Sequence, residues 1–143
     1  MRLFLDTSSL FKLYHSEDGT ESLLEFFRNE KISEISLAEI SKIEFHSVVW
    51  KKYRMKEIER IHADYIIQKF SNDWGSYLFV KYNFHQTDLA ISLLGKYWDL
   101  GLRTLDSIQL AALIVSKANI FSTADKVLMD IARHEGVEIL KLQ

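Results

Sequence analysis

The sequence predicts an α/β fold in which helices cover both faces of a central, mostly parallel sheet of four to five strands. Short apolar segments of strand character alternate with longer segments of helical periodicity along the whole chain. No repeat, low-complexity tract or linker interrupts this alternation, and proline is absent. Strands that are separated by helices pair in parallel through right-handed crossovers, which gives a three-layer α/β/α arrangement.

The alternation assigns each part of the chain in order. Five short segments with apolar centres are expected to be strands: Arg2–Leu5, Lys31–Ser36, Tyr77–Tyr82, Asn119–Ser122 and Val137–Leu142. Seven segments repeat apolar residues at helical spacing and are expected to be helices: Ser8–His15, Thr20–Asn29, Leu37–Tyr53, Lys56–Asn72, Gln86–Trp98, Asp106–Lys117 and Asp125–His134. The chain therefore reads as one domain, residues 1–143.

Composition limits the classes of function. With 143 residues and 48% hydrophobic content, the chain can bury roughly two thirds of its unfolded surface in one core. The absence of cysteine excludes disulfides and thiolate metal sites and is compatible with the reducing cytoplasm, where we expect the protein to act. The longest apolar run, LAALIV, is too short to span a bilayer, and the start MRLFLDTSS becomes polar before a signal-peptide core forms, so we expect no membrane insertion.

The formal net charge of -2 argues against binding nucleic acid through overall charge. One local exception is WKKYRMKEIER, Trp50–Arg60, which places five basic residues beside Trp50 and Tyr53 but also contains Glu57 and Glu59. A solvated helix end is the favoured interpretation of this segment, and a local contact with nucleic acid is the alternative.

Glu44 is the most unusual residue of the chain. On the predicted helix Leu37–Tyr53 it shares a face with Leu37, Ile40 and Val48, which places a carboxylate on the stripe expected to meet the core. An ionised carboxylate that is buried alone would take up a proton or find a cation. A partner for Glu44 is therefore implied, either an arginine or a metal ion, unless the side chain reaches solvent at the edge of the helix.

Three aspartates lie where such a partner would be bound. Asp6 ends the first strand, Asp125 follows the fourth, and Asp106 opens an apolar helix. Because the carboxyl ends of parallel strands form the binding edge of an α/β sheet, these acids and Glu44 are expected to meet in one pocket. Helix capping explains each aspartate singly, but it does not explain Glu44.

Four carboxylates without histidine or cysteine favour a hard cation, Mg²⁺ or Mn²⁺, and hence phosphodiester or phosphoryl chemistry. Without metal, mutual repulsion should make at least one of these carboxyl groups hold its proton to unusually high pH. Ser8 and Thr123 stand within two residues of Asp6 and Asp125, so their hydroxyls are expected either to orient a carboxylate or to cap a helix.

The segments LDTSSL, SLAEISKIEF, LRTLDSIQLAA and IFSTADKVL, taken in this order, resemble the PIN-domain nucleases, especially the VapC-type toxins of toxin–antitoxin pairs. The resemblance runs from the first strand to GVEIL. It implies a PIN-like fold and RNA cleavage with Mg²⁺ or Mn²⁺, leaving 5′-phosphate and 3′-hydroxyl ends. It also implies a small antitoxin as partner, and a homodimer. The metal-binding and catalytic residues that it implies are Asp6, Glu44, Asp106 and Asp125.

Two cations beside the acids are candidate contacts for RNA phosphates, namely Arg103 and Lys126. For Arg103, an exposed side chain or an ion pair with a neighbouring acid is an equal alternative.

Two other functions remain as alternatives. One is a Mg²⁺-dependent phosphotransfer domain. The haloacid-dehalogenase type is disfavoured because it needs an aspartate where Ser8 stands, and the receiver type because it needs an aspartate at the end of a middle strand, where YLFVKYNF has none. The other is a PIN-like module that acts only by binding proteins, for which three Trp, six Tyr and nine Phe supply ample aromatic surface. Retention of all four acids favours the nuclease.

Overall fold

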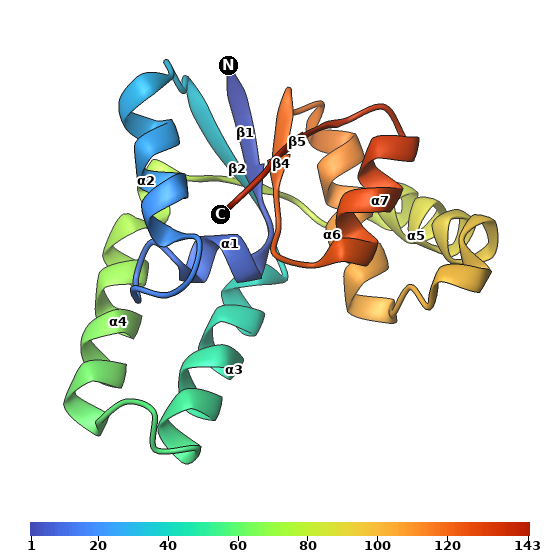
Figure 1. The fold of residues 1–143 in the computed structure, drawn as a ribbon. Helices are drawn as coiled ribbons and strands as arrows, with labels where there is room; N and C mark the ends of the chain where they lie inside the picture. Colours follow the sequence, from blue (N-terminus) through green and yellow to red (C-terminus); the bar gives the residue numbers. More distant parts are fainter.

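A computed structural model describes residues 1–143 and contains one sheet of five parallel strands in the order β3-β2-β1-β4-β5 (Figure 1). The strands are β1 (Arg2–Leu5), β2 (Glu34–Ala38), β3 (Leu78–Val80), β4 (Ile120–Ser122) and β5 (Glu138–Leu140). At the centre of the sheet, Phe4 of β1 lies opposite Ser36 of β2 and Phe121 of β4. All strand pairs are parallel, so their carboxyl ends share one edge of the sheet.

The α-helices are α1 (Thr7–Phe11), α2 (Thr20–Asn29), α3 (Ser41–Arg54), α4 (Arg60–Asp73), α5 (Phe84–Lys96), α6 (Thr104–Ser116) and α7 (Lys126–His134), with short 3₁₀ turns at Trp74–Ser76 and Trp98–Leu100. None of them combines the length and the apolar character needed to cross a membrane. In Figure 1, α3 and α4 run side by side as a hairpin on one side of the sheet, and α5, α6 and α7 lie together on the other.

Alternation along β1 divides the core into two. Leu3 and Leu5 join a cluster with apolar residues of α1 to α4, including Phe45 and Phe70. Phe4 points to the other face and packs in a second cluster that includes Leu93, Leu110 and Leu128 of α5, α6 and α7. Side chains of successive strand residues point to opposite faces, so both faces of the sheet carry a buried apolar layer. The three-layer α/β/α fold predicted from the sequence is confirmed.

Several predicted boundaries are wrong. Leu37 and Ala38 belong to β2, where they pair with Phe79 and Val80, and α3 starts at Ser41 instead of Leu37. Both residues are fully buried beneath helices, the usual setting of a parallel strand. The first helix ends at Phe11 and gives way to turns before His15. The other ends lie within four residues of the predicted ones.

The largest of these remaining shifts is at the start of α4, which begins at Arg60 instead of Lys56. Lys56 has a φ of 60°, the left-handed conformation in which helices commonly end. This residue therefore closes the hairpin turn between α3 and α4 and delays the second helix.

Candidate active site

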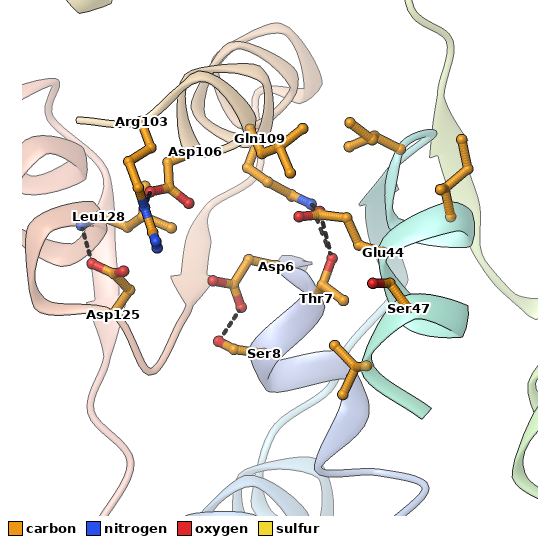
Figure 2. A pocket seen from close by; sticks show the side chains of 14 residues that line it. Asp6, Thr7, Ser8, Glu44, Ser47, Arg103, Asp106, Gln109, Asp125 and Leu128 are labelled. Carbon is orange, nitrogen blue, oxygen red and sulfur yellow. Dashed lines mark hydrogen bonds and ion pairs between the residues drawn. The ribbon is translucent and has the colours of Figure 1, made fainter. Parts of the chain in front are cut away.

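A pocket of about 450 Å³ lies at the carboxyl end of β1, between α1, α3, α6 and α7 (Figure 2). Asp6, Glu44, Asp106 and Asp125 all line it, although they come from four separate segments of the chain. The other polar residues of the lining are Thr7, Ser8, Ser47, Arg103 and Gln109. The structure thus brings the four predicted acids to one cavity at the predicted edge of the sheet; their catalytic role stays a prediction.

Asp6 forms the floor of the pocket and is only 4% exposed. It directly follows β1 and caps the N-terminus of α1, accepting a hydrogen bond from the backbone N–H of Ser9 at 2.9 Å. The hydroxyl of Ser8 donates to Oδ1 at 2.7 Å, and the hydroxyl of Thr123 donates to Oδ2. Both predicted supporting residues therefore orient this carboxylate.

Burial raises the pKa of Asp6 to about 6. The hydrogen bonds from Thr123, Ser8 and Ser9 favour the charged form and limit the rise, and the negative charge of Glu44 makes the smallest contribution to it. The expectation that one acid of the group holds its proton unusually strongly is supported. The main cause is loss of hydration, not the repulsion between carboxylates that the sequence suggested.

Glu44 is held by neutral donors from two other helices. The hydroxyl of Thr7 donates to its Oε1 at 2.8 Å and the side-chain amide of Gln109 donates to the same atom at 2.7 Å, as Figure 2 shows. The amide nitrogen of Gln109 also lies 2.9 Å from the hydroxyl of Ser41. No arginine pairs with Glu44, since Arg103 pairs with Asp106. Both hydrogen bonds to Glu44 end on Oε1, and its second oxygen, Oε2, has no protein partner.

The direction of Glu44 differs from the prediction. The fully buried positions of α3 are Ser41, Phe45 and Val49, which form the stripe that packs on the core. Glu44 stands beside this stripe, on the face that also carries Ile40 and lines the pocket. The carboxylate is therefore directed into a cavity instead of the apolar core, which removes most of the cost of burying it.

Asp125 and Asp106 occupy the other side of the pocket. Asp125 caps α7 and accepts hydrogen bonds from the backbone N–H groups of Val127 at 2.8 Å and Leu128 at 3.1 Å. Asp106 lies in the first turn of α6, which begins at Thr104 with Arg103 as its N-cap. The expectation that Asp106 opens this helix is therefore wrong, and capping, the alternative explanation for this aspartate, does not apply. Asp106 instead pairs with the Nε of Arg103 at 3.3 Å.

The two predicted RNA contacts have different positions. Arg103 lines the pocket, and its side chain is 79% exposed although it pairs with Asp106. Lys126 is exposed at the start of α7 and does not line the pocket. Arg103 is therefore the cation that stands at the acids, and the ion pair considered as its alternative is present.

Sequence reasoning did not single out Thr7 or Gln109. Both are buried, and both donate to Glu44. A signal for Gln109 was available, because it is an uncharged polar residue in an apolar helix, SIQLAALIV, three residues after Asp106. Its Oε1 is buried and has no hydrogen-bond partner. The amide nitrogen alone accounts for the polar contacts of this side chain.

The pocket fits a hard divalent cation in the kind of donor it offers, because neither histidine nor cysteine lines it. No group of three or more acidic or histidine side chains is arranged to hold a metal ion. Mg²⁺ is usually held by only one or two carboxylates and completes its shell with water and substrate phosphates. The acids therefore suit an ion that one or two of them bind directly.

Residues 3–134 match the sequence model of the family described as PIN domain. No curated protein matches the chain by sequence. Among solved structures, FitAcB from Neisseria gonorrhoeae superposes with a TM-score of 0.71 at 12% identity, covering 97% of this chain and 96% of the other.

Two further solved structures resemble the chain over most of its length. VapBC2 from Rickettsia felis, solved with a DNA fragment from its promoter, has a TM-score of 0.69 at 14% identity and covers 100% of both chains. VapC20 from Mycobacterium tuberculosis, described as a toxin that cleaves the sarcin–ricin loop, has a TM-score of 0.66 at 11% identity, covering 90% of this chain and 94% of the other. At these identities the likeness establishes the fold.

Proposed function

Because the chain belongs to the PIN domain family, we propose that it is a Mg²⁺- or Mn²⁺-dependent endoribonuclease that hydrolyses RNA phosphodiester bonds. The observation that carries the proposal is the single pocket in which Asp6, Glu44, Asp106 and Asp125 lie at the carboxyl end of the central strand. Helix capping accounts for two of these acids, but it accounts neither for Glu44 nor for the burial of Asp6.

In this proposal the acids, the residues that hold them and Arg103 take different parts in the reaction. Asp6 and Glu44 would hold the ion, with Asp106 and Asp125 placed to bind it directly or through water. When bound, such an ion supplies a water of lowered pKa and neutralises charge on the leaving oxygen. Thr7, Ser8 and Thr123 fix the carboxylates of Glu44 and Asp6. Arg103 is placed to contact a phosphate of the RNA.

The biochemical test is cleavage of RNA by the purified protein. Activity should require Mg²⁺ or Mn²⁺ and stop in excess EDTA, and the products should carry 5′-phosphate and 3′-hydroxyl ends. Cleavage that is equally fast in EDTA would refute the proposal. Sequencing 5′ ends of cellular RNA after brief induction of the wild type or of Asp6→Asn would then identify the substrate.

We further propose that the protein is the toxin of a toxin–antitoxin pair and a homodimer. The support is family membership together with an acidic pocket that attracts cations, to which a small antitoxin could offer an arginine. Expression of the chain alone should be toxic to cells, and light scattering should show a dimer. A harmless protein that remains monomeric at all practical concentrations would remove the support for both ideas.

A further inference from the structure

The helix that carries Glu44 continues past the pocket and changes character along one face. Ser47, one turn after Glu44, still lines the pocket. Lys51 lies one turn beyond Ser47, and Arg54 lies almost one turn further, so both extend the face that lines the cavity. At 1.5 Å of rise per residue, Lys51 is about 10 Å and Arg54 about 15 Å from Glu44 along the helix axis.

These two cations are free to act on a ligand. Both are exposed, and neither takes part in any ion pair of the structure. Lys52, by contrast, pairs with Glu57 at 3.1 Å, and its ammonium group lies 5.6 Å from the ring centre of Phe11 in α1. Of these three basic residues of α3, Lys52 is held by contacts within the protein, whereas Lys51 and Arg54 are unpaired.

An exposed aromatic residue accompanies the two cations. Trp50 is 37% exposed and directly precedes Lys51 in α3. The guanidinium of Arg60, at the start of α4, lies 5.0 Å from the centre of its ring, which holds the indole in place at the hairpin. A cationic track with a fixed aromatic side chain is the combination that binds single-stranded nucleic acid without reading its sequence.

We propose that Lys51, Arg54 and Trp50 form a track that binds single-stranded RNA beside the scissile phosphate and leads it out of the pocket. The proposal rests on the proposed nuclease function and names a substrate surface outside its acidic centre. It also explains how a chain of net charge -2 can bind a polyanion, because the cations are gathered on one face of one helix.

The test measures binding of fluorescein-labelled poly(U) by anisotropy in EDTA, at several salt concentrations. Lys51→Gln and Arg54→Gln should each weaken binding by about two- to fivefold. Each should also lower the slope of log K against log salt by about 0.7, the value for one lost contact with a single strand. Trp50→Leu should weaken binding without changing that slope, because stacking releases no counterions.

The matched control is Lys31→Gln, which removes the same charge from the amino end of β2, at the opposite edge of the sheet from the pocket. It should leave both affinity and slope unchanged. In cleavage assays with Mg²⁺, Lys51→Gln and Arg54→Gln should raise KM with little change in kcat.

The outcomes separate this proposal from the one on which it rests. Wild-type protein that neither binds nor cuts RNA would refute the nuclease function itself. Wild-type protein that binds RNA, with Lys51→Gln and Arg54→Gln no different from Lys31→Gln, would overturn the track alone. Unchanged RNA binding together with lost binding to poly-glutamate would assign this surface to an acidic protein and would also overturn the track.

Discussion

The two halves of the acidic pocket differ in how their carboxylates are held. In the inner half, Thr7 and Gln109 donate to Glu44 and Thr123 donates to Asp6, each from another segment of the chain. Asp6 also accepts local hydrogen bonds from Ser8 and Ser9. In the outer half, Asp125 accepts backbone N–H groups of its own helix and Asp106 pairs with Arg103 three residues away. The outer contacts are local ones that many helix starts possess. The inner contacts from Thr7, Gln109 and Thr123 join distant segments and exist only in the folded protein.

This difference separates acids that stabilise the folded state from acids whose burial destabilises it. An aspartate that caps a helix stabilises the folded state, and so does a first-turn aspartate near the helix N-terminus. Asp6 also caps a helix, yet its burial costs enough to raise its pKa to about 6. A buried carboxyl group that weakens the fold at neutral pH is typical of a site maintained for function.

Removing a charge from the inner half should have the largest effect on activity. Asp6→Asn and Glu44→Gln keep the shape of each side chain and should each lower the cleavage rate by about 10²–10³-fold, the usual loss when one electrostatic group of an active site is removed. The measurement is the initial rate of RNA cleavage at saturating Mg²⁺.

Glu39→Gln is the control for these variants, because Glu39 pairs with Lys42 at 2.8 Å and does not line the pocket. It should cleave RNA at the wild-type rate. Equal activity of wild type and Glu44→Gln would show that the inner half has no part in catalysis.

The second prediction concerns pH and uses metal-free protein. Because burial raises the pKa of Asp6 from 3.8 to about 6, the folded state holds this proton more tightly than the unfolded chain does. The resulting stabilisation is complete below the unfolded pKa and is lost as the pH rises through the folded one. Between pH 4 and pH 7 in EDTA, the free energy of unfolding should fall by roughly 2–3 kcal/mol more in wild type than in Asp6→Asn.

Urea unfolding of both proteins across this pH range measures the difference. Parallel curves for wild type and Asp6→Asn would mean that the proton of Asp6 is not linked to folding, and the distinction between the two halves would then lose its energetic basis.

Gln109 tests whether the inner half depends on its supporting donors. Gln109→Leu removes the amide that donates to Glu44 while keeping similar volume, and it should lower Mn²⁺ affinity or activity by about 10–100-fold. Ser41→Ala is the matched control, since Ser41 contacts Gln109 and Thr7 but not Glu44. Isothermal titration with Mn²⁺ and cleavage rates provide two independent readings.

If Gln109 acts through Glu44, then Gln109→Leu should cost little more once Glu44→Gln is already present. Full additivity of the two substitutions would indicate that Gln109 contributes only packing.

The sequence predicted the layers of the fold and the membership of the pocket, because both follow from periodicity and from the carboxyl edge of a parallel sheet. It misplaced the start of α3, since the strand residues Leu37 and Ala38 continue the apolar pattern of the helix after them. It also missed Thr7 and Gln109, whose roles depend on contacts with Glu44 across 37 and 65 positions of the chain. Thr7 has no local pattern that indicates such a contact, and the only signal for Gln109 is its place as an uncharged polar residue in an apolar helix.

The smallest effects are expected in the outer half, in metal-free protein. Asp106→Asn removes one side of an ion pair whose arginine is 79% exposed, so the free energy of unfolding in EDTA should change by less than about 0.5 kcal/mol. Asp125→Ala removes a helix cap and should cost about 1 kcal/mol, whereas Asp125→Asn, which can still cap, should cost much less.

In millimolar Mg²⁺, unlike in EDTA, Asp106→Asn should be clearly less stable than wild type. A ligand that binds only the folded state stabilises it by RT ln(1 + [L]/Kd), so wild type should gain stability and Asp106→Asn should gain much less. Thermal melting of wild type and Asp106→Asn, with and without Mg²⁺, measures both the stability difference in metal-free protein and the stabilisation by Mg²⁺. If Asp106→Asn destabilises the metal-free protein by more than about 1 kcal/mol and keeps the full Mg²⁺ response, Asp106 stabilises the start of α6 and does not bind the metal.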